Sequence, residues 1–275
     1  MNQQQTPLSH TIDVTRPSVA RMHDYFLGGK DNYPADRRAC ERLLAHAPSA
    51  QILAVNNRRF LHRVIRCLIQ DHGIRQFLDI GSGLPTKDNV HEIAQHYAPG
   101  AKVAYVDHDP MVLAYGRALL EDYRRTDRRI VTVQADLRDP DALLDHPAVT
   151  GILDLHRPVA VLYLSVLHCV ADRDRPADIV RRTAARLSPG SFVAVSHLVS
   201  EDAAVRRTLT DLMAQSTGGQ WGAVRRAEDV DRFFTALDIL DPGLVDVAAW
   251  RADPLMGPRQ RTWEWIQYGG VARVP

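Results

Sequence analysis

The sequence predicts an α/β protein whose core is an open, mostly parallel β-sheet flanked by helices. Residues 76–80 form a short apolar run, interrupted by one Asp, that leads directly into a Gly-Ser-Gly turn. A helix-like pattern begins at Asn89, and a second apolar run over residues 102–106 ends in Asp107. A buried strand that turns through glycines into a helix, followed by another strand, is typical of this fold class.

The glycine turn and Asp107 together indicate a nucleoside site. Gly81 and Gly83, on either side of Ser82, lack the Cβ that would keep the backbone away from a ligand at the end of the strand. A carboxylate at the tip of the second strand, where Asp107 stands with His108 after it, can accept hydrogen bonds from both ribose hydroxyls. A Gly-x-Gly alone is more often a turn than a site, but the acid at this distance favours ligand binding.

The residues around the turn favour S-adenosylmethionine over a dinucleotide. Dinucleotide folds continue to a third glycine, which allows close helix–strand packing under a pyrophosphate, whereas Thr86 holds that place here, after Pro85. Asp79, just before the turn, would repel a pyrophosphate but suits a ligand with an ammonium group. S-adenosylmethionine combines a ribose diol, an amino group and a sulfonium, so the segment looks like the first two motifs of a Rossmann-like methyltransferase.

Three stretches of the sequence resemble one protein family. They are Pro-Ser-x-Ala-Arg-x-x-Asp-Tyr-x-x-Gly-Gly-Lys-Asp-Asn from residue 17, Leu-Asp-Ile-Gly-x-Gly-Leu-Pro-Thr from residue 78, and Asn-Val-His-Glu from residue 89. Together they resemble an actinobacterial family of S-adenosylmethionine-dependent methyltransferases of unknown substrate, over nearly the whole chain from about Asp13. The resemblance implies a Rossmann-like methyltransferase fold, that cofactor and S-adenosylhomocysteine as its product. It names no acceptor, and the Leu-Pro-Thr insertion leaves open how the methionine carboxylate is held.

The chain is expected to have three parts. Residues 1–15 are polar and read as a flexible tail. Residues 16–70 are expected to form a helical cap, and residues 71–275 a Rossmann-like domain that binds the cofactor.

Two helices are predicted within the expected cap. The first follows Pro17 and ends at Gly28 and Gly29. The second covers residues 49–71, with Gly73 just past its end. Its arginines are interpreted as a solvated face: Arg58, Arg59, Arg63 and Arg66.

The segment over residues 21–33 is predicted to fold over the cofactor as a lid. Tyr25 offers a ring to bury the ligand and is a candidate catalytic residue, while Gly28 and Gly29 offer backbone amides. Lys30 is placed to meet the methionine carboxylate. The alternative is a packing arm that ends in a glycine turn.

Further strands complete a predicted sheet of seven, with one antiparallel member near the C-terminus. They are expected over residues 130–133, 158–164, 191–197, 244–248 and 265–274. Helices are expected over residues 201–215 and 228–237, split by a loop over residues 216–221 that either lines the acceptor pocket or only connects them. Three tryptophans are interpreted as core or edge packing rather than a substrate cage: Trp250, Trp263 and Trp265.

Two more strand ends carry candidate site residues. Asp136 can accept from the adenine amino group and Leu137 can cover a ring face, although an acid there can equally cap a helix before Pro140. Ser165 and His168 follow the fourth strand, at the edge where the sulfonium is expected. His168 is either a general base or a structural histidine.

Composition limits the classes of function. The net charge of +1 implies no strong nucleic-acid or membrane field, and no apolar run is long enough for a membrane span. The three cysteines are widely spaced and the N-terminus is polar, which indicates a cytoplasmic protein. No metal-ligand pattern is visible, so we expect a metal-free reaction. The oligomeric state is left open between a monomer and a homodimer. We expect methyl transfer to a small-molecule acceptor. The alternatives are a non-catalytic S-adenosylmethionine-binding regulator and an NAD-linked oxidoreductase.

Overall fold

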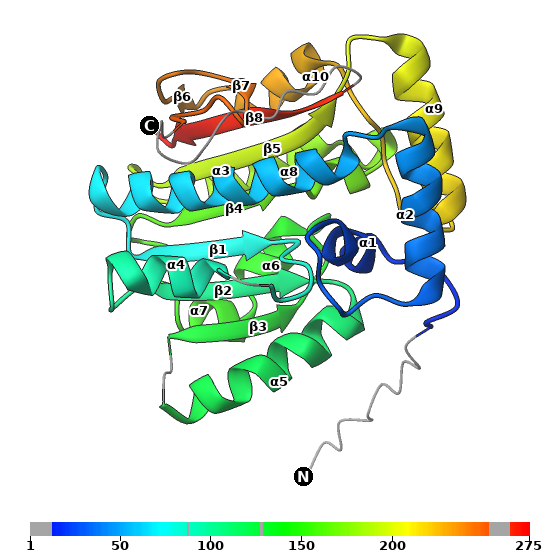
Figure 1. Cartoon of the computed structure of the whole chain (residues 1–275). Coiled ribbons are helices and arrows are strands. Elements are labelled where there is room, and N and C mark those ends of the chain that lie inside the picture. The colour runs from blue at the N-terminus through cyan, green and yellow to red at the C-terminus, as the bar shows by residue number, and fades with distance from the viewer. Residues whose placement is uncertain (1–12, 87, 127–128, 253–264) are drawn as a thin grey trace.

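The computed structural model describes residues 13–86, 88–126, 129–252 and 265–275, and backbone alone over 119–126. Its centre is one eight-stranded sheet in the order β3-β2-β1-β4-β5-β8-β6, with β7 also pairing with β8 (Figure 1). The five parallel strands are β1 (Gln76–Ile80), β2 (Lys102–Asp107), β3 (Ile130–Gln134), β4 (Ala160–Leu164) and β5 (Phe192–Val199). The strand order reverses between β1 and β4, where ligands bind in open α/β sheets.

The C-terminal strands confirm the antiparallel member and add one strand. β8 (Ile266–Arg273) runs antiparallel to β5, and both β6 (Asp238–Ile239) and β7 (Val245–Asp246) pair antiparallel with β8. β6 was not expected, because a helix was predicted through residue 237. The helix ends early, as α10 (Ala227–Asp231) and the 3₁₀ turn η3 (Arg232–Phe234), and Ala236 has a left-handed φ of 63° that no helix accommodates.

Helices cover both faces of the sheet (Figure 1). In that view α3 (Ala50–Gln70) and α4 (Val90–Tyr97) lie in front, while α6 (Pro140–Leu144), α7 (Pro147–Thr150) and α8 (Pro176–Ala185) lie behind. α5 (Pro110–Thr126) lies beside the β3 edge. At the carboxyl ends of the strands are α1 (Val19–Phe26), α2 (Pro34–His46) and α9 (Ala203–Ser216). The expected tail over residues 1–15 lies mostly outside the described residues.

Strand alternation divides the core into two layers. In β1, Phe77 packs on the face covered by α3 and α4, and Leu78 packs on the opposite face with α8. Because side chains alternate along a strand, Asp79 lies on the same face as Phe77. The strand end therefore presents a carboxylate toward α3.

The prediction that all four α3 arginines are solvated was wrong. Arg63 is 6% exposed, and it donates hydrogen bonds to the carbonyls of Trp250 (2.7 Å) and Val247 (2.5 Å). Arg58 stands three and seven residues before Leu61 and Ile65, both buried, so it continues the helix face that meets the sheet. At about 100° per residue the four arginines spread over about 140° of the helix, with Arg58 and Arg63 at the two edges of this arc. These two therefore reach the packed sides of α3.

The ends of the helices form a third apolar cluster beside the carboxyl edge of the sheet. It joins α1, α2, the first turns of α3 and α9, and it includes Trp221 and Trp265. Trp250 is instead fully buried on the sheet, edge-on to Phe60 at 5.3 Å, which confirms its predicted packing role. Trp263 lies outside the described residues.

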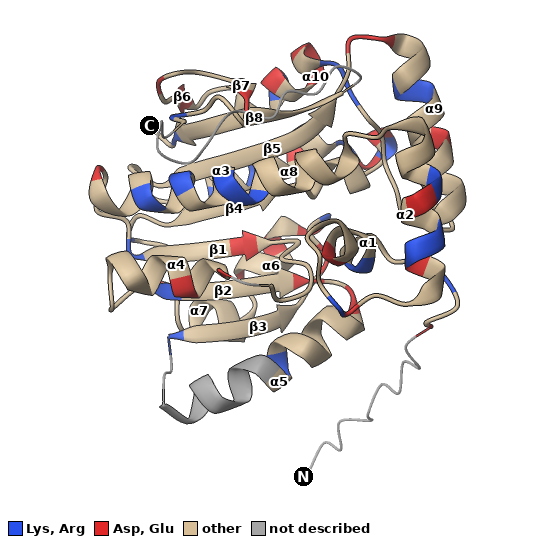
Figure 2. Cartoon of the chain, in the orientation of Figure 1, with Lys and Arg blue, Asp and Glu red and all other residues tan. Residues whose placement is uncertain are grey.

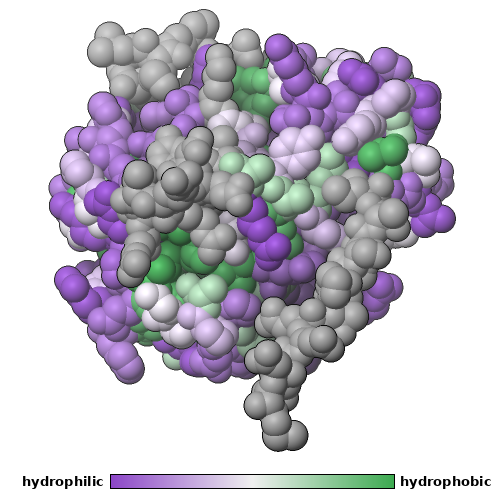
Figure 3. Space-filling view, turned by 90° about the horizontal axis from the view of Figure 1, so that it is seen from below, coloured by the Kyte–Doolittle hydropathy of each residue, from purple (hydrophilic) through white to green (hydrophobic). Residues whose placement is uncertain are grey.

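The surface of the described residues is largely polar. Seen from below, hydrophilic residues predominate and hydrophobic ones gather near the centre of the face (Figure 3). Val14 and Ile239 are the large hydrophobic residues that are exposed in the described part of the chain. None of the helices within that part is long and apolar enough to cross a membrane.

Candidate active site

A cavity of about 410 Å³ opens at the carboxyl ends of β1, β2, β3 and β4. Its size is within the range of small-molecule sites. It brings together most of the residues predicted from the sequence: Asp79, Gly81, Ser82, Gly83, Thr86, Asp107, His108, Asp136, Leu137, Ser165 and His168. We call the lining residues of the segments 79–86, 106–109, 135–138 and 164–174 the strand-end wall. The lining residues of α1, α2, α3, α9 and the segment 219–221 are the helical wall.

Two glycines shape the first turn of the strand-end wall for different reasons. Gly81 has φ 71°, and a Cβ there would lie 2.2 Å from Cγ2 of Val166. Gly83 has φ 66° with open space where its Cβ would be, and its N–H donates to Oδ2 of Asp107 at 3.0 Å. The turn therefore keeps its backbone next to the cavity.

Asp107 is buried at the tip of β2 and is held in place by backbone donors. It accepts from the N–H groups of Gly83 and Asp109 (2.9 Å), and Nδ1 of His108 lies 3.5 Å away. Burial raises the pKa of Asp107, and the two N–H donors oppose that shift. A carboxylate oriented in this way, with one side open to the cavity, fits a ribose diol.

Asp79 and Arg58 lie close together at the floor of the cavity, although they are far apart in the sequence. Figure 2 shows acidic residues at the ends of β1 and β2. Burial raises the pKa of Asp79 to about 7, although the guanidinium of Arg58 lowers it. Arg58 donates to Oγ1 of Thr86. One carboxylate and one guanidinium thus flank the turn, and they match the ammonium and carboxylate of an amino acid.

Arg58 was missed from the sequence as a site residue. The signal was its spacing, since it falls on the same face of α3 as Leu61 and Ile65. A charged residue on an otherwise apolar helix face is unfavourable unless it has a polar partner, and Arg58 has one in Thr86 at the glycine turn.

Asp136 and Leu137 line the cavity beyond β3. Asp136 accepts from the backbone N–H (2.9 Å) and the guanidinium of Arg138, and that side-chain bond lowers the pKa of the carboxyl. It does not cap the next helix, because Asp139 caps α6 through the N–H of Ala142.

A polar chain joins the residue after β4 to side chains of α3, β5 and β8 at the base of the cavity. Ser165 has φ 57°, and its N–H donates to Oγ of Ser196 at 2.9 Å. Ser196 in turn donates to Oδ1 of Asn57 at 2.6 Å, and Gln267 donates to Oγ of Ser165. Asn57 and Gln267 both line the cavity, and neither was predicted.

His168 belongs to the 3₁₀ turn η1 (Leu167–Cys169) and is fixed from behind. Trp221 packs on its ring at 4.8 Å, and its carbonyl accepts from the N–H groups of Gly222 and Ala223, both at 3.0 Å. The loop over residues 216–221, left open between pocket and connector, thus contributes Gly219, Gln220 and Trp221 to the lining.

A buried arginine braces the same turn. Arg225 donates to the carbonyls of Leu167 (3.1 Å) and Val170 (2.7 Å), to Asp172 in η2 (Asp172–Asp174), and to Nε2 of His197 at 2.8 Å. Burial lowers the pKa of His168 to about 3, with the charge of Arg225 acting in the same direction. His168 is therefore neutral at physiological pH.

His23 is a second imidazole in the lining, and sequence reasoning missed it. It comes from α1, and burial lowers its pKa to about 4, with the charge of Arg58 acting in the same direction. It lies in the motif over residues 21–33 that was predicted as a lid, where it was not named as a site residue.

The other residues chosen in that motif are not among the lining residues: Tyr25, Gly28, Gly29 and Lys30. Tyr25 is half-buried against the apolar cluster of the helix ends, and the other three are exposed. A Cβ on Gly29 would lie 1.9 Å from Oδ1 of Asp24. Asp24 is buried and accepts from Asp31 N–H (2.9 Å) and Asn32 Nδ2 (2.8 Å). This turn therefore folds around its own aspartate.

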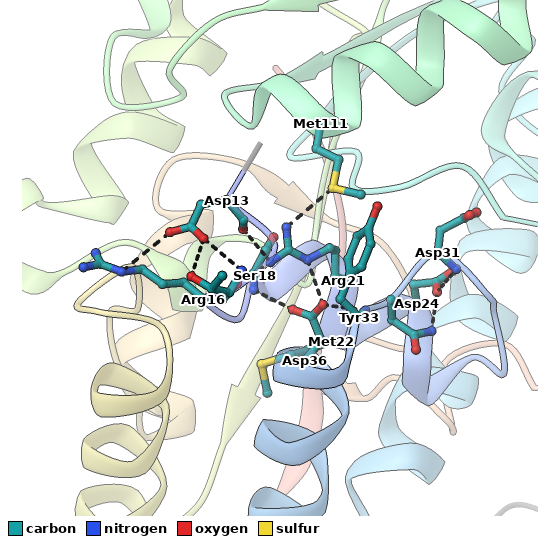
Figure 4. A network of polar contacts seen from close by, with 12 residues as sticks. Asp13, Arg16, Ser18, Arg21, Met22, Asp24, Asp31, Tyr33, Asp36 and Met111 are labelled. Atoms are coloured by element: carbon teal, nitrogen blue, oxygen red, sulfur yellow. Dashed lines mark hydrogen bonds and ion pairs between the residues drawn. The ribbon is translucent and has the colours of Figure 1, made fainter. Parts of the chain in front are cut away.

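A buried ion pair fastens the start of α1 above the cavity (Figure 4). Nε of Arg21 donates to Oδ2 of Asp36 at 2.8 Å, and Asp36 also accepts from the N–H groups of Ser18 (2.9 Å) and Tyr33 (2.8 Å). Oγ of Ser18 donates to the carboxylate of Asp109 at 3.0 Å. Asp109 follows Asp107 by two residues and donates its N–H to it. α1 thus forms a roof, with Met22, His23 and Phe26 in the lining.

A family model described as S-adenosyl methyltransferase matches residues 5–275, which is nearly the whole chain. The chain belongs to this family. The cofactor of this methyltransferase is therefore S-adenosylmethionine, as the glycine turn and its acids predicted, and the NAD alternative falls away. No curated protein matches the sequence.

Two solved structures resemble this methyltransferase along its length. A provisionally assigned methyltransferase from Thermobifida fusca YX has 37% identity and a TM-score of 0.84, covering 95% of this chain and 96% of its own. A DUF574 family protein from Streptomyces avermitilis has 37% identity and a TM-score of 0.86, covering 96% and 99%. The mitomycin 7-O-methyltransferase MmcR, at 17% identity and a TM-score of 0.52 over 94% and 74%, shares the fold.

Proposed function

We propose that this methyltransferase acts on a small molecule inside the cavity. The observation that carries the proposal is the continuity of the lining, because the strand-end wall that suits the cofactor and the apolar helical wall enclose one space. The buried Arg21–Asp36 ion pair holds α1, which forms the roof, against α2. A site closed in this way suits an acceptor that enters the cavity better than one segment of a large surface.

The strand-end wall supports a specific orientation of the cofactor. Asp107 would accept both ribose hydroxyls, since its carboxylate is already oriented by Gly83 and Asp109. Asp136 and Leu137 would contact the adenine. Asp136 is bound to Arg138 on one side, so the adenine amino group would share this carboxylate with the guanidinium.

The methionine end of the cofactor would lie between Asp79 and Arg58. Asp79 would bind the ammonium, and contact with that charge would favour the ionised carboxylate whose pKa burial raises to about 7. Arg58 and Thr86 would bind the carboxylate, since the two side chains are already hydrogen-bonded to each other beside the turn. Under this proposal, Arg58 and Thr86 hold the carboxylate where the sequence lacks a third glycine.

The cofactor supplies a methyl group on a sulfonium, which is a good leaving group. The protein aligns the acceptor with it and excludes water. The roof helix α1 and the Trp221 loop close the space above the strand ends. The role of His168 as a base, and that of Tyr25 in catalysis, remain predictions.

The setting of the enzyme is also part of the proposal. Two of its three free cysteines are buried and Cys169 lines the cavity, where burial raises the thiol pKa to about 12. Unpaired thiols of this kind suit a reducing cytoplasm. The near-neutral net charge of +1 favours no nucleic-acid partner, and we propose a monomer or homodimer.

Calorimetry with S-adenosylhomocysteine tests the cofactor site, and we expect micromolar affinity, about −8 kcal/mol, with NAD far weaker. Transfer of a labelled methyl group from S-adenosylmethionine into a size-fractionated bacterial extract tests the acceptor class. Label should appear in the low-molecular-weight fraction. Label confined to protein or nucleic acid would refute the small-molecule proposal.

A further inference from the structure

The two walls of the cavity differ in charge. Each of the four segments of the strand-end wall contains charged side chains, including Asp79, Asp107 and Asp136. Among the described residues of the helical wall, Arg58 is the one side chain that is charged at neutral pH. Since Arg58 lies beside Thr86 at the proposed carboxylate position, the rest of the described helical wall offers neither a carboxylate for a cation nor a guanidinium for an anion.

The helical wall is apolar and partly aromatic. Met22 and Phe26 of α1, Leu53 of α3, Met213 of α9 and Trp221 converge on the cavity. All five are buried in the same apolar cluster, apart from the sides that face the space. Aromatic and thioether side chains of this kind favour a flat apolar ligand.

Polar groups are few in this space, and some are without partners. Trp221 and His168 are 6% and 4% exposed and line the cavity, yet Trp221 Nε1 and His168 Nδ1 have no hydrogen-bond partner. An unpaired buried polar group is unfavourable by about 1 to 3 kcal/mol. His23 adds a second neutral imidazole from the roof. Both unpaired atoms are covered by neighbouring atoms of the wall, so His23 is the imidazole that a ligand hydroxyl in the cavity can meet.

We infer that the acceptor is an uncharged, largely aromatic molecule that is methylated on a hydroxyl group, and that His23 receives the hydroxyl proton. The inference rests on the proposed function, because it assigns the space beside the cofactor to the acceptor. Its basis is the juxtaposition of a helical wall that is uncharged apart from Arg58, in the described residues, and the imidazole that α1 adds to the lining.

The step balances as follows in atoms and electrons. A lone pair of the hydroxyl oxygen forms the new bond to the methyl carbon, and the pair of the breaking carbon–sulfur bond stays on sulfur. The hydroxyl proton moves to a ring nitrogen of His23 and then to water. The products are the methyl ether and S-adenosylhomocysteine. No further reactant is needed.

The low basicity of the imidazole discriminates between acceptor groups. An oxygen that has gained a methyl group while it keeps its proton is a very strong acid, so an imidazole with pKa about 4 is sufficient to remove that proton. An alkylammonium ion holds its proton with a pKa near that of lysine, about 10. His23 would not deprotonate it, and the helical wall has no carboxylate to bind it.

Three probes with one ring system test this assignment. They are 1-naphthol, 1-naphthylmethylamine and 1-naphthoate, which present a hydroxyl, an ammonium and a carboxylate at pH 7. Each is titrated by calorimetry into the protein saturated with S-adenosylhomocysteine. We expect naphthol to bind at least tenfold more tightly than either charged probe. Trp221→Ala should weaken naphthol binding without changing the affinity for S-adenosylhomocysteine.

His23→Phe keeps a ring of similar size and separates binding from proton transfer. With labelled S-adenosylmethionine and naphthol, it should lower the transfer rate by roughly 10²-fold while S-adenosylhomocysteine still binds. His46→Phe, on the exposed end of α2, is the matched control and should transfer at the parental rate. An unchanged rate in His23→Phe overturns the role of His23.

The outcomes distinguish this inference from the proposed function. Tighter binding of the ammonium or carboxylate probe, or no binding of any probe to a protein that binds S-adenosylhomocysteine, overturns the acceptor class and leaves the cofactor assignment intact. Failure of S-adenosylhomocysteine itself to bind overturns both.

Discussion

The strand-end wall and the helical wall face the same cavity but are built by different rules. In the strand-end wall, each functional side chain sits within a few residues of the strand that positions it, as Asp107 does at the tip of β2. In the helical wall, Met22, Leu53 and Trp221 come from segments far apart in the chain. Local backbone geometry therefore fixes the wall proposed to bind the cofactor, whereas packing between helices fixes the wall proposed to face the acceptor. Variants of the strand-end wall, and of Arg58 where the helical wall meets the glycine turn, should alter cofactor affinity. Other variants of the helical wall should alter stability or acceptor choice.

Asp107→Ala should have the largest effect. It removes the acceptor of two ribose hydroxyls, so the affinity for S-adenosylhomocysteine should fall by roughly 2 to 4 kcal/mol. Calorimetry measures this directly. Asp145→Ala removes an exposed carboxylate that pairs with Arg186 at 2.5 Å and serves as the control. Equal affinities in the two variants would take Asp107 out of the site.

Arg58→Ala should weaken S-adenosylhomocysteine binding by about 1.5 to 3 kcal/mol, because one charge-assisted contact to the carboxylate is lost. Arg59→Ala, its neighbour on α3, is the matched control, since Arg59 does not line the cavity. A decarboxylated S-adenosylhomocysteine identifies the group that Arg58 binds. If Arg58→Ala weakens both ligands equally, the guanidinium does not contact the carboxylate.

Gly29→Ala should lower the free energy of unfolding by about 1 to 3 kcal/mol, since its Cβ would overlap the Asp24 carboxylate at 1.9 Å. Gly28→Ala, with φ 75° but nothing within 4 Å of its Cβ, should lose roughly 1 kcal/mol. Urea unfolding measures both. Cofactor affinity should stay the same if this turn is structural, and a loss of affinity without a loss of stability would restore the lid interpretation.

The affinity for S-adenosylhomocysteine should depend on pH through Asp79. The pKa of this carboxyl is raised to about 7, mainly by burial, so below pH 7 the protonated form predominates in the free protein. Binding the ammonium requires the ionised form, so affinity should fall about tenfold per pH unit below 7 and level off above it. Asp79→Asn should bind more weakly at pH 8 and remove the slope. A slope that persists in Asp79→Asn would assign the titration to another group.

Much of the fold and of the strand-end wall could be predicted because their signals are local. The first strand was predicted over residues 76–80, and it is β1. A helix-like pattern was predicted to begin at Asn89, and α4 follows directly from it, with the N–H of Asn89 donating to Glu92 at 2.7 Å. Burial on both faces of a parallel sheet demands continuous apolar runs, and a turn beside a ligand demands glycine. Both requirements act on residues that are adjacent in the sequence, so a short stretch is enough to recognise them.

What the sequence determined by itself was the sheet, the glycine turn and the acids at the strand tips. Tertiary structure decided which residues of the helices join them. Arg58 and Arg59 are adjacent and identical in type, yet Arg58 lines the cavity and Arg59 does not. Tyr25 and His23 share one motif, and α1 turns His23 toward the cavity. A helix places neighbouring side chains about 100° apart, so its docking angle on the sheet, which depends on contacts distant in sequence, selects the residues that face the ligand.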